Sequence, residues 1–253
     1  MHSLWPLPPG EADTEALVGL YAYPQPLDRP HVRVNFVSSV DGAVTLAGRS
    51  GGLSSEADQD LFALLRALAD VVFVGAGTAR VEGYHGVRYK PSNAALRKRL
   101  GLSGHAPIAV VSGSAAIDPD GGLITDTAVP TIVFTTEDAP AERRQALAAA
   151  GADVVVAGKS WVDPAVAVAE LGARGLCRVL CEGGPRLLGD LVMAGLVDEM
   201  CLTVAPVLLA GPAGRIAHGL GAPAPLGLRL ASALHDNDNL LLRYVRTGEG
   251  AAT

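Results

Sequence analysis

The chain has 253 residues, of which 49% are hydrophobic and 18% charged, so it can bury a sizeable core and is not a disordered protein. Its formal net charge of −6 argues against a non-specific nucleic-acid binder, which needs a basic face. Three cysteines without a Cys-x-x-Cys pair, six histidines without ligand spacing and the lack of a membrane-length apolar run favour a cytoplasmic protein with free thiols and no metal site.

The chain begins with a proline-rich arm, residues 1–30, in which residues 11–21 form a short helix and no chemistry is evident. Apolar and polar residues then alternate from Val32 to Val40, which predicts a strand that stops at the turn Asp41-Gly42. Asp41 has two interpretations. Its carboxylate either caps this turn, or faces a ligand crevice at the carboxyl end of the strand.

The clearest helix of the chain starts at Ser55, where Ser55-Glu56-Ala57-Asp58 resembles a capping box. Leucines then recur at helical spacing, at Leu61, Leu64, Leu65 and Leu68. Arg66 falls near this apolar stripe. It either turns toward an anion or extends into solvent.

A continuous apolar run, Val71 to Gly75, predicts a buried parallel strand that ends in the glycine turn Gly75-Ala76-Gly77-Thr78. Further short apolar strands alternate with helical patterns. The strands are residues 108–112, 131–135 and 154–157, and the helices 141–150 and 164–173. This alternation predicts parallel βαβ units with right-handed crossovers in one α/β domain, residues 31–247.

The stretch from Val179 to Gly189 joins a strand to a helix through Glu182, Gly183, Gly184 and Pro185. Proline is tolerated at the first position of a helix, and the unpaired amides of a helix start attract anions. The turn is therefore either a pyrophosphate cradle or an ordinary strand-to-helix corner. It lacks both the G-x-G-x-x-G spacing and the lysine of a P-loop.

The C-terminal part reads as β structure. The long apolar stretch from Val197 to Leu209 predicts a strand whose exposed edge would favour a homodimer. Residues 226–234 and 240–245 predict an antiparallel hairpin, and residues 248–253 a frayed tail.

Four of these segments, in their order and spacing, resemble the reductase domain of the riboflavin-biosynthesis deaminase/reductase, the RibD C-terminal-domain family. They are Val34 to Gly42, Leu65-Arg66-Ala67, Asp70 to Thr78, and Glu182-Gly183-Gly184-Pro185. The resemblance implies the dihydrofolate-reductase-like fold: a mixed, mostly parallel central sheet with helices on both faces and a C-terminal antiparallel hairpin. It also implies NADPH-dependent hydride transfer to the ribosylamino carbon of a phosphorylated pyrimidine such as 5-amino-6-(5-phosphoribosylamino)uracil.

The resemblance assigns roles residue by residue. The implied cofactor-binding residues are Gly52, Gly75, Gly77, Thr78, Gly183, Gly184, Pro185, Arg186, Leu187 and Leu188. The implied substrate-binding residues are Ser50, Arg66, Arg88 and Glu182, of which the arginines suit a sugar phosphate and Glu182 matches the acid that binds the pyrimidine. Reduction of an open-chain imine also needs a proton source, and Asp41 and Glu82 remain equal candidates for it.

The chain departs from the family pattern in three places. No zinc deaminase signature precedes the reductase part, so we do not expect deamination. Glu82-Gly83-Tyr84 replaces an Asp-Asp-Pro segment, and Gly51-Gly52-Leu53 replaces a segment that often contains tryptophan. Both replacements touch the substrate side, so a reductase of dihydrofolate or another pterin remains an alternative, as does a nucleotide-binding sensor without turnover.

Overall fold

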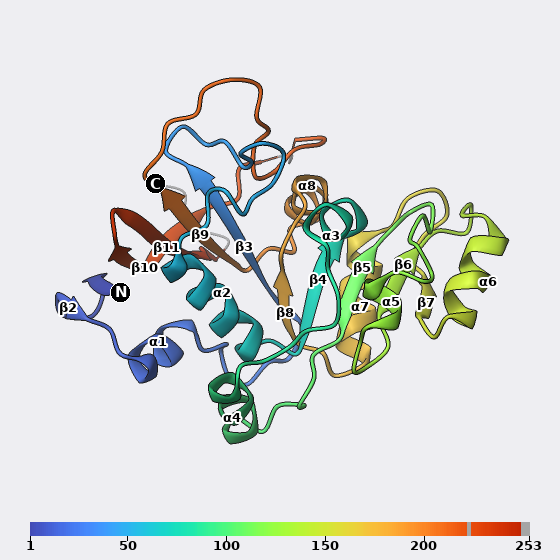
Figure 1. Cartoon of the computed structure of the whole chain (residues 1–253), viewed down its shortest axis with the longest axis horizontal. Coiled ribbons are helices and arrows are strands. Elements are labelled where there is room, and N and C mark those ends of the chain that lie inside the picture. Colours follow the sequence, from blue (N-terminus) through green and yellow to red (C-terminus); the bar gives the residue numbers. More distant parts are fainter. Residues whose placement is uncertain (222–223, 249–253) are drawn as a thin grey trace.

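The computed structural model describes residues 1–221 and 224–248, in which one eleven-stranded sheet runs through the whole molecule (Figure 1). Of the predicted tail, residues 248–253, only Gly248 is among the described residues. The strands are ordered β2-β1-β10-β11-β9-β3-β8-β4-β5-β6-β7. Every pair from β9 to β7 is parallel, and every pair from β2 to β9 is antiparallel, so the sheet is mixed and mostly parallel.

The strands match the predicted apolar runs closely, and two short N-terminal strands add to them. The strands are β1 (His2–Trp5), β2 (Gly10–Glu11), β3 (His31–Ser39), β4 (Val71–Gly75), β5 (Ile108–Val111), β6 (Ile132–Thr135), β7 (Asp153–Val156), β8 (Arg178–Cys181), β9 (Glu199–Ala205), β10 (Leu228–Asp236) and β11 (Asn239–Arg246). The last two form the predicted hairpin.

Eight helices are present in the described part of the chain. They are α1 (Thr14–Tyr21), α2 (Glu56–Leu68), α3 (Ala76–Glu82), α4 (Pro91–Arg99), α5 (Gly122–Thr125), α6 (Ala141–Ala149), α7 (Pro164–Ala173) and α8 (Pro185–Met193). The Ser55 hydroxyl caps α2 by accepting a hydrogen bond from the Asp58 amide, as the capping box predicts. Pro185 occupies the first turn of α8.

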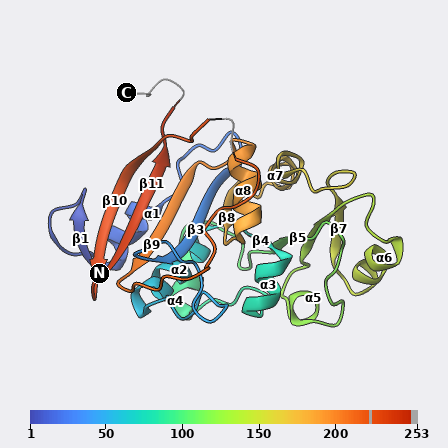
Figure 2. The same cartoon turned by 90° about the horizontal axis from the view of Figure 1, so that it is seen from above.

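Helices cover both faces of the sheet, with α7 and α8 on one side and α2 and α4 on the other (Figure 2). Along β4, Val71 and Phe73 face the α7 and α8 side, whereas Val72 and Val74 face the opposite side. Because both faces of the strand are buried, its sequence is a continuous apolar run rather than an alternating one.

The order of strands brings β8 to the centre of the sheet. The chain builds β4, β5, β6 and β7 outward, and then returns to place β8 between β3 and β4. The carboxyl ends of these parallel strands lie at one edge, where open α/β sheets bind ligands. Glu182, directly after β8, therefore lies at the middle of this edge.

The strand β9 lies inside the sheet, paired with β3 on one side and β11 on the other. This corrects the expectation that residues 197–209 leave an exposed apolar edge, because both edges of β9 are hydrogen-bonded. That argument for a homodimer no longer holds. The dimer itself stays a prediction.

Candidate functional site

The two glycine corners of the sequence meet at the carboxyl edge of the sheet. The Gly75 amide donates a hydrogen bond to the Gly183 carbonyl oxygen at 2.7 Å. The backbone of Gly183 has a φ of 94°, and a Cβ there would contact the Phe36 ring at 3.0 Å, so the position requires glycine. A Cβ on Gly184 would collide with the Thr78 hydroxyl. The starts of α3 and α8 are thereby held side by side.

A cleft of about 700 Å³, here called the α8 cleft, opens where these two helices begin. Of the predicted cofactor residues, Gly75, Gly77, Thr78, Gly184, Pro185, Arg186 and Leu187 line it. The first amides of α8 have no partner within the helix, and the helix dipole adds positive potential there. Arg186 is exposed at the same helix start, so the cleft offers both backbone donors and a cation to an anionic group.

Three predicted cofactor residues lie outside the lining of the α8 cleft. Leu188 is only 2% exposed, and packs in the core on the α7 and α8 side of the sheet. Gly52 packs against Leu46, whose side chain lies 3.0 Å from the position of a Cβ on this glycine. Gly183 contributes its carbonyl to the joint with Gly75 rather than a surface to the cleft.

A second cleft of about 350 Å³, here called the β3 cleft, adjoins the first. It is lined by residues of β3, the first turns of α2, the segment 44–51, Tyr84 and Glu182. Five residues line both clefts: Thr45, Thr78, Glu82, Gly184 and Pro185. The two clefts therefore form one groove across the sheet edge, with Glu82 as the only ionisable side chain among the five shared residues.

Glu82 is held in place by Ser50. Its Oε1 atom accepts hydrogen bonds from the Ser50 amide at 3.0 Å and from the Ser50 hydroxyl at 2.9 Å. Within the described residues, Oε2 has no hydrogen bond, so one carboxylate oxygen is available to a bound molecule. Both residues were predicted to act here, Ser50 on the substrate side and Glu82 as a proton source.

Asp41 does not reach this groove, which corrects the expectation that it faces the same crevice as Glu182. In the parallel register Val34 is level with Cys181, so Asn35 is the β3 residue level with Glu182, and Asp41 lies six residues further along. A strand rises about 3.3 Å per residue, which carries Asp41 well past the groove. Its carboxylate accepts hydrogen bonds from Ser39 and from the amides of Leu209 and Ala210.

These contacts also determine the ionisation of Asp41. The hydrogen bonds from the Ser39 hydroxyl and the Ala210 amide lower the pKa of this carboxyl group. The group stays ionised near neutral pH, and so it is a poor proton donor.

Arg66 and Glu182 come together as a bidentate ion pair rather than as two separate substrate ligands. The Arg66 Nε and Nη2 atoms each donate to Glu182 at 2.7 Å, and Tyr84 donates its hydroxyl to Glu182 Oε2 at 2.5 Å. Burial opposes the charged form of Arg66, but the Glu182 carboxylate outweighs it and raises the arginine pKa. Burial, reinforced by the charge of Glu182, raises the pKa of Tyr84 well above its usual value.

Arg88 lies away from the groove. It is exposed, forms an ion pair with Asp126 at 2.7 Å, and lines a separate cavity beside Tyr89 and His105. The two arginines that were predicted on the substrate side therefore lie at different places in this structure. The first arginine is held by Glu182, and the second belongs to another surface.

Several residues of the groove escaped the sequence analysis. Tyr84 was visible only as a departure from the family pattern, and Asp58 only as a helix-capping residue. Asn35, Phe62 and Trp161 also line the groove and carried no signal in their local sequence. Within the described residues, no cluster of three or more His, Cys, Asp or Glu side chains could hold a metal ion, and no helix is long and apolar enough to cross a membrane.

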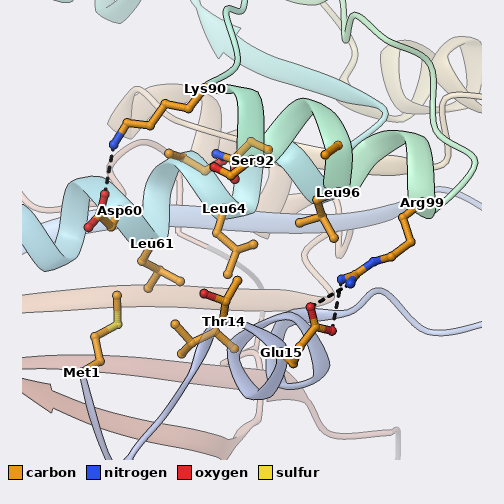
Figure 3. Close-up of a pocket in the computed structure, with 14 residues that line it drawn as sticks. Met1, Thr14, Glu15, Asp60, Leu61, Leu64, Lys90, Ser92, Leu96 and Arg99 are labelled. Carbon is orange, nitrogen blue, oxygen red and sulfur yellow. Dashed lines mark hydrogen bonds and ion pairs between the residues drawn. The ribbon is translucent and has the colours of Figure 1, made fainter.

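A further cavity of about 500 Å³ lies between α1, α2 and α4, far from the glycine corners (Figure 3). Its floor is apolar, with Leu61, Leu64 and Leu96. Its charged rim is already paired, Lys90 with Asp60 and Arg99 with Glu15, as Figure 3 shows. Paired charges of this kind offer little to a ligand, so we place the functional site in the groove.

Comparison with known proteins shows the family of the chain. Residues 30–242 match the family model of the RibD C-terminal domain. The chain is 32% identical over 191 residues, 73% of its length, to the 2,5-diamino-6-ribosylamino-4(3H)-pyrimidinone 5′-phosphate reductase of Aquifex aeolicus, and covers 80% of that protein. It is 30% identical over 183 residues, 72% of its length, to the reductase of the same name from Methanothermobacter thermautotrophicus, of which it covers 81%.

A solved structure shares the fold. The pyrimidine reductase-like protein of Corynebacterium diphtheriae superposes with a TM-score of 0.78 at 28% identity, over 87% of this chain and 93% of the other. The family match spans the sheet edge, both glycine corners and the groove between them. The chain therefore belongs to the RibD C-terminal domain family.

Proposed function

We propose that this protein is an NADPH-dependent reductase of riboflavin biosynthesis that transfers hydride to the ribosylamino carbon of a ribosylaminopyrimidine 5′-phosphate. The observation that carries the proposal is the continuous groove, in which an anion-attracting helix start and a polar cleft share five residues. The relatives named as 2,5-diamino-6-ribosylamino-4(3H)-pyrimidinone 5′-phosphate reductases support the same reaction class.

The residues of the α8 cleft fit a dinucleotide. Gly75 and Gly184 bring two backbone segments together without a Cβ between them, and the free amides of α8 suit a pyrophosphate. We assign the pyrophosphate to the start of α8 beside Arg186, and the nicotinamide to the part of the groove shared by Thr45, Thr78 and Glu82. When bound, the cofactor supplies the hydride.

The residues of the chain have three tasks in this reaction. The β3 cleft holds the pyrimidine so that the ribosylamino carbon faces the shared part of the groove, which is a positioning effect. Opening of the sugar ring, in which the ring oxygen takes a proton and the amino nitrogen gives one up, makes this carbon the carbon of an open-chain imine. Glu82 delivers a proton to the imine nitrogen while the carbon receives hydride, so that one hydride and one proton saturate the C=N bond. The Ser50 hydrogen bonds fix the direction of the Glu82 carboxyl group.

The ion pair of Arg66 with Glu182 supports the wall of the β3 cleft, which Glu182 and Phe62 line. With its guanidinium 4.4 Å from the centre of the Phe62 ring, Arg66 also orients an aromatic surface for the substrate. Glu182 also accepts a hydrogen bond from the Tyr84 hydroxyl, and so holds this second side chain that lines the β3 cleft in place. In this proposal, Glu182 acts on the substrate mainly through the residues that it holds.

The proposal is tested by the oxidation of NADPH by purified protein, followed by its absorbance. We expect oxidation with a ribosylaminopyrimidine 5′-phosphate, slower oxidation of NADH, and none with dihydrofolate. Oxidation with dihydrofolate alone would replace the proposal with a pterin reductase. Tight NADPH binding without turnover on either compound would favour a nucleotide sensor.

A further inference from the structure

We propose that Asp58 reads the edge of the substrate ring and makes this enzyme selective for a 2-amino-4-oxopyrimidine over the corresponding uracil. This inference rests on the proposed function, and concerns the ring held in the β3 cleft. It assigns a specificity role to a residue whose sequence signal was helix capping alone.

Asp58 lies in the first turn of α2, and is only 6% exposed. Asp58 lines the β3 cleft together with Ser54 and Gln59, so its small exposed area faces this cleft. A buried carboxylate is costly unless hydrogen bonds compensate for the lost water. A carboxylate at this position therefore calls for donors, either from the protein or from a ligand.

The protein supplies only part of those donors. Ser54 donates its hydroxyl to Asp58 Oδ2 at 2.5 Å. Within the described residues this is the only hydrogen bond to the carboxylate. The Asp58 amide, rather than its side chain, completes the cap with Ser55. Oδ1 is thus left for a donor that comes from the cleft.

The other carboxylate at the inner wall of the β3 cleft is already occupied. Glu182 accepts two hydrogen bonds from Arg66 and one from Tyr84, and its side chain is only 1% exposed. Its negative charge is balanced by the guanidinium. Glu82, whose Oε2 atom is also free, lies in the part of the groove shared with the α8 cleft. Of the carboxylates that line the β3 cleft alone, Asp58 is consequently the one with a free oxygen among the described residues.

The chemistry of the ring sets the selectivity. A 2-amino-4(3H)-pyrimidinone presents two adjacent donors, the N3–H group and the 2-amino group, which match the two oxygens of a carboxylate. At Asp58 one donor would bind the free Oδ1 atom, and the other would bind the second lone pair of Oδ2 beside the Ser54 hydroxyl. In a uracil, an oxygen replaces the amino group, and this acceptor would face Asp58. The site would then lose one hydrogen bond and gain a repulsive contact, the form of discrimination that buried polar groups give most strongly.

The remaining polar side chains of the cleft do not make this distinction. Asn35 and Gln59, which line it, each carry an amide with both a donor and an acceptor. An amide can turn to suit either ring. A carboxylate has a fixed preference for donors, and outside the part of the groove shared with the α8 cleft Asp58 supplies the one with a free oxygen among the described residues.

The test compares two substrates that differ only at position 2, the 2,5-diamino-pyrimidinone and the 5-aminouracil ribosylamino 5′-phosphates, with wild type and Asp58→Asn. We expect wild type to favour the 2-amino compound by about 100-fold in kcat/KM. In Asp58→Asn the ratio falls to about 10-fold or less, because an amide can donate to the 2-oxygen. Asp60→Asn, on the exposed side of the same helix, should keep the wild-type ratio.

Two results would overturn the inference. One is a wild-type enzyme that uses both pyrimidines equally well, and the other is an Asp58→Asn variant that loses activity on both to the same extent. A wild-type enzyme that is active on dihydrofolate but on neither pyrimidine would instead overturn the proposed function, while Asp58 could still bind the same 2-amino-4-oxo edge. In that case Asp58 would bind dihydrofolate, and Asp58→Asn should lower the rate of dihydrofolate turnover.

Discussion

At the scale of single residues, the structure distinguishes the two carboxylates that the sequence analysis left as equal candidates for the proton source: Glu82 lines the groove and Asp41 does not. Both are carboxylates near glycine turns, and nothing local separates them. The structure separates them by strand length, because β3 continues beyond the level at which β8 ends. The length of β3 relative to β8 depends on pairing with distant segments, so it cannot be predicted from either segment alone.

The first prediction concerns the proton. We expect Glu82→Gln to lower kcat by about 10²- to 10⁴-fold with little change in KM, because the amide keeps the Ser50 contact but cannot deliver a proton. Steady-state kinetics with saturating NADPH measure this. Asp41→Asn serves as the comparison. If Asp41→Asn abolished turnover while Glu82→Gln left it intact, the assignment of the proton donor would be reversed.

The Arg66–Glu182 pair shows a second limit at the residue scale. Both residues were predicted on the substrate side; Glu182 lines the groove, whereas Arg66 lies behind it as the ion-pair partner of Glu182. Their mutual contact joins positions 116 residues apart, so the sequence analysis treated as two independent ligands what is one ion pair in the structure. Arg88 shows the reverse case, since its partner Asp126 takes it to another surface.

At the scale of elements, the apolar runs predicted the strands well, whereas the helix α4 went unseen. Its buried face is provided largely by Arg97, which is 1% exposed and donates to the carbonyl oxygens of Ala67 and Ala69 at the end of α2. An arginine that satisfies the free carbonyls of a neighbouring helix leaves no apolar periodicity to detect. The two-residue strand β2 is likewise too short to leave a pattern.

The second prediction tests the junction of α3 with α8. Gly184→Ala places a Cβ against the Thr78 hydroxyl, and should push the two helix starts apart. We expect the KM for NADPH to rise by about 10-fold or more, since small misplacements in such sites are costly. Binding titrations would check this. Gly19→Ala in α1 is the matched control, because nothing lies within 4 Å of its Cβ position.

The double variant Gly184→Ala with Thr78→Ala separates the clash from the loss of a contact. It removes the hydroxyl that the new Cβ would meet, and so it should bind NADPH more tightly than Gly184→Ala alone. An unchanged affinity in the single variant would show that the junction tolerates the methyl group, and would argue against a shared cradle.

At the scale of the whole molecule, the first thirty residues contribute two strands, β1 and β2, to the sheet whose edge carries the groove. The strand β1 pairs with β10, and Tyr23 covers the Arg33 guanidinium at 4.1 Å from its ring centre. Arg33 and Glu199 beneath it are fully buried, and Arg243 joins them at 2.7 Å from Glu199. The sequence indicated an arm but not this buried cluster, whose members come from four distant segments.

The third prediction follows from that cluster. Burial opposes the ionised form of Glu199, but Arg33 and Arg243 outweigh it and hold the pKa well below its ordinary value. A depressed pKa stabilises the fold above the unfolded value of about 4.3, and the contribution is lost as the pH falls below it. The free energy of unfolding should therefore be flat near neutral pH and decline below about pH 5.

Glu199→Gln isolates this contribution. It leaves the buried guanidinium of Arg33 and the half-buried one of Arg243 without their carboxylate, and should lower the free energy of unfolding at neutral pH by about 3–5 kcal/mol. The decline in acid should then be shallower than in wild type. Urea denaturation across a pH series measures both effects, and parallel acid profiles for the two proteins would rule out Glu199 as the source.

The central claim is that the two glycine corners form one groove that holds a dinucleotide against a pyrimidine. A crystal structure of the NADP⁺ complex tests it most directly. We predict the pyrophosphate at the start of α8 beside Arg186, and the nicotinamide ring between Thr45, Thr78 and Glu82. A cofactor bound in the cavity between α1, α2 and α4, or with its nicotinamide away from Glu82, would contradict the account.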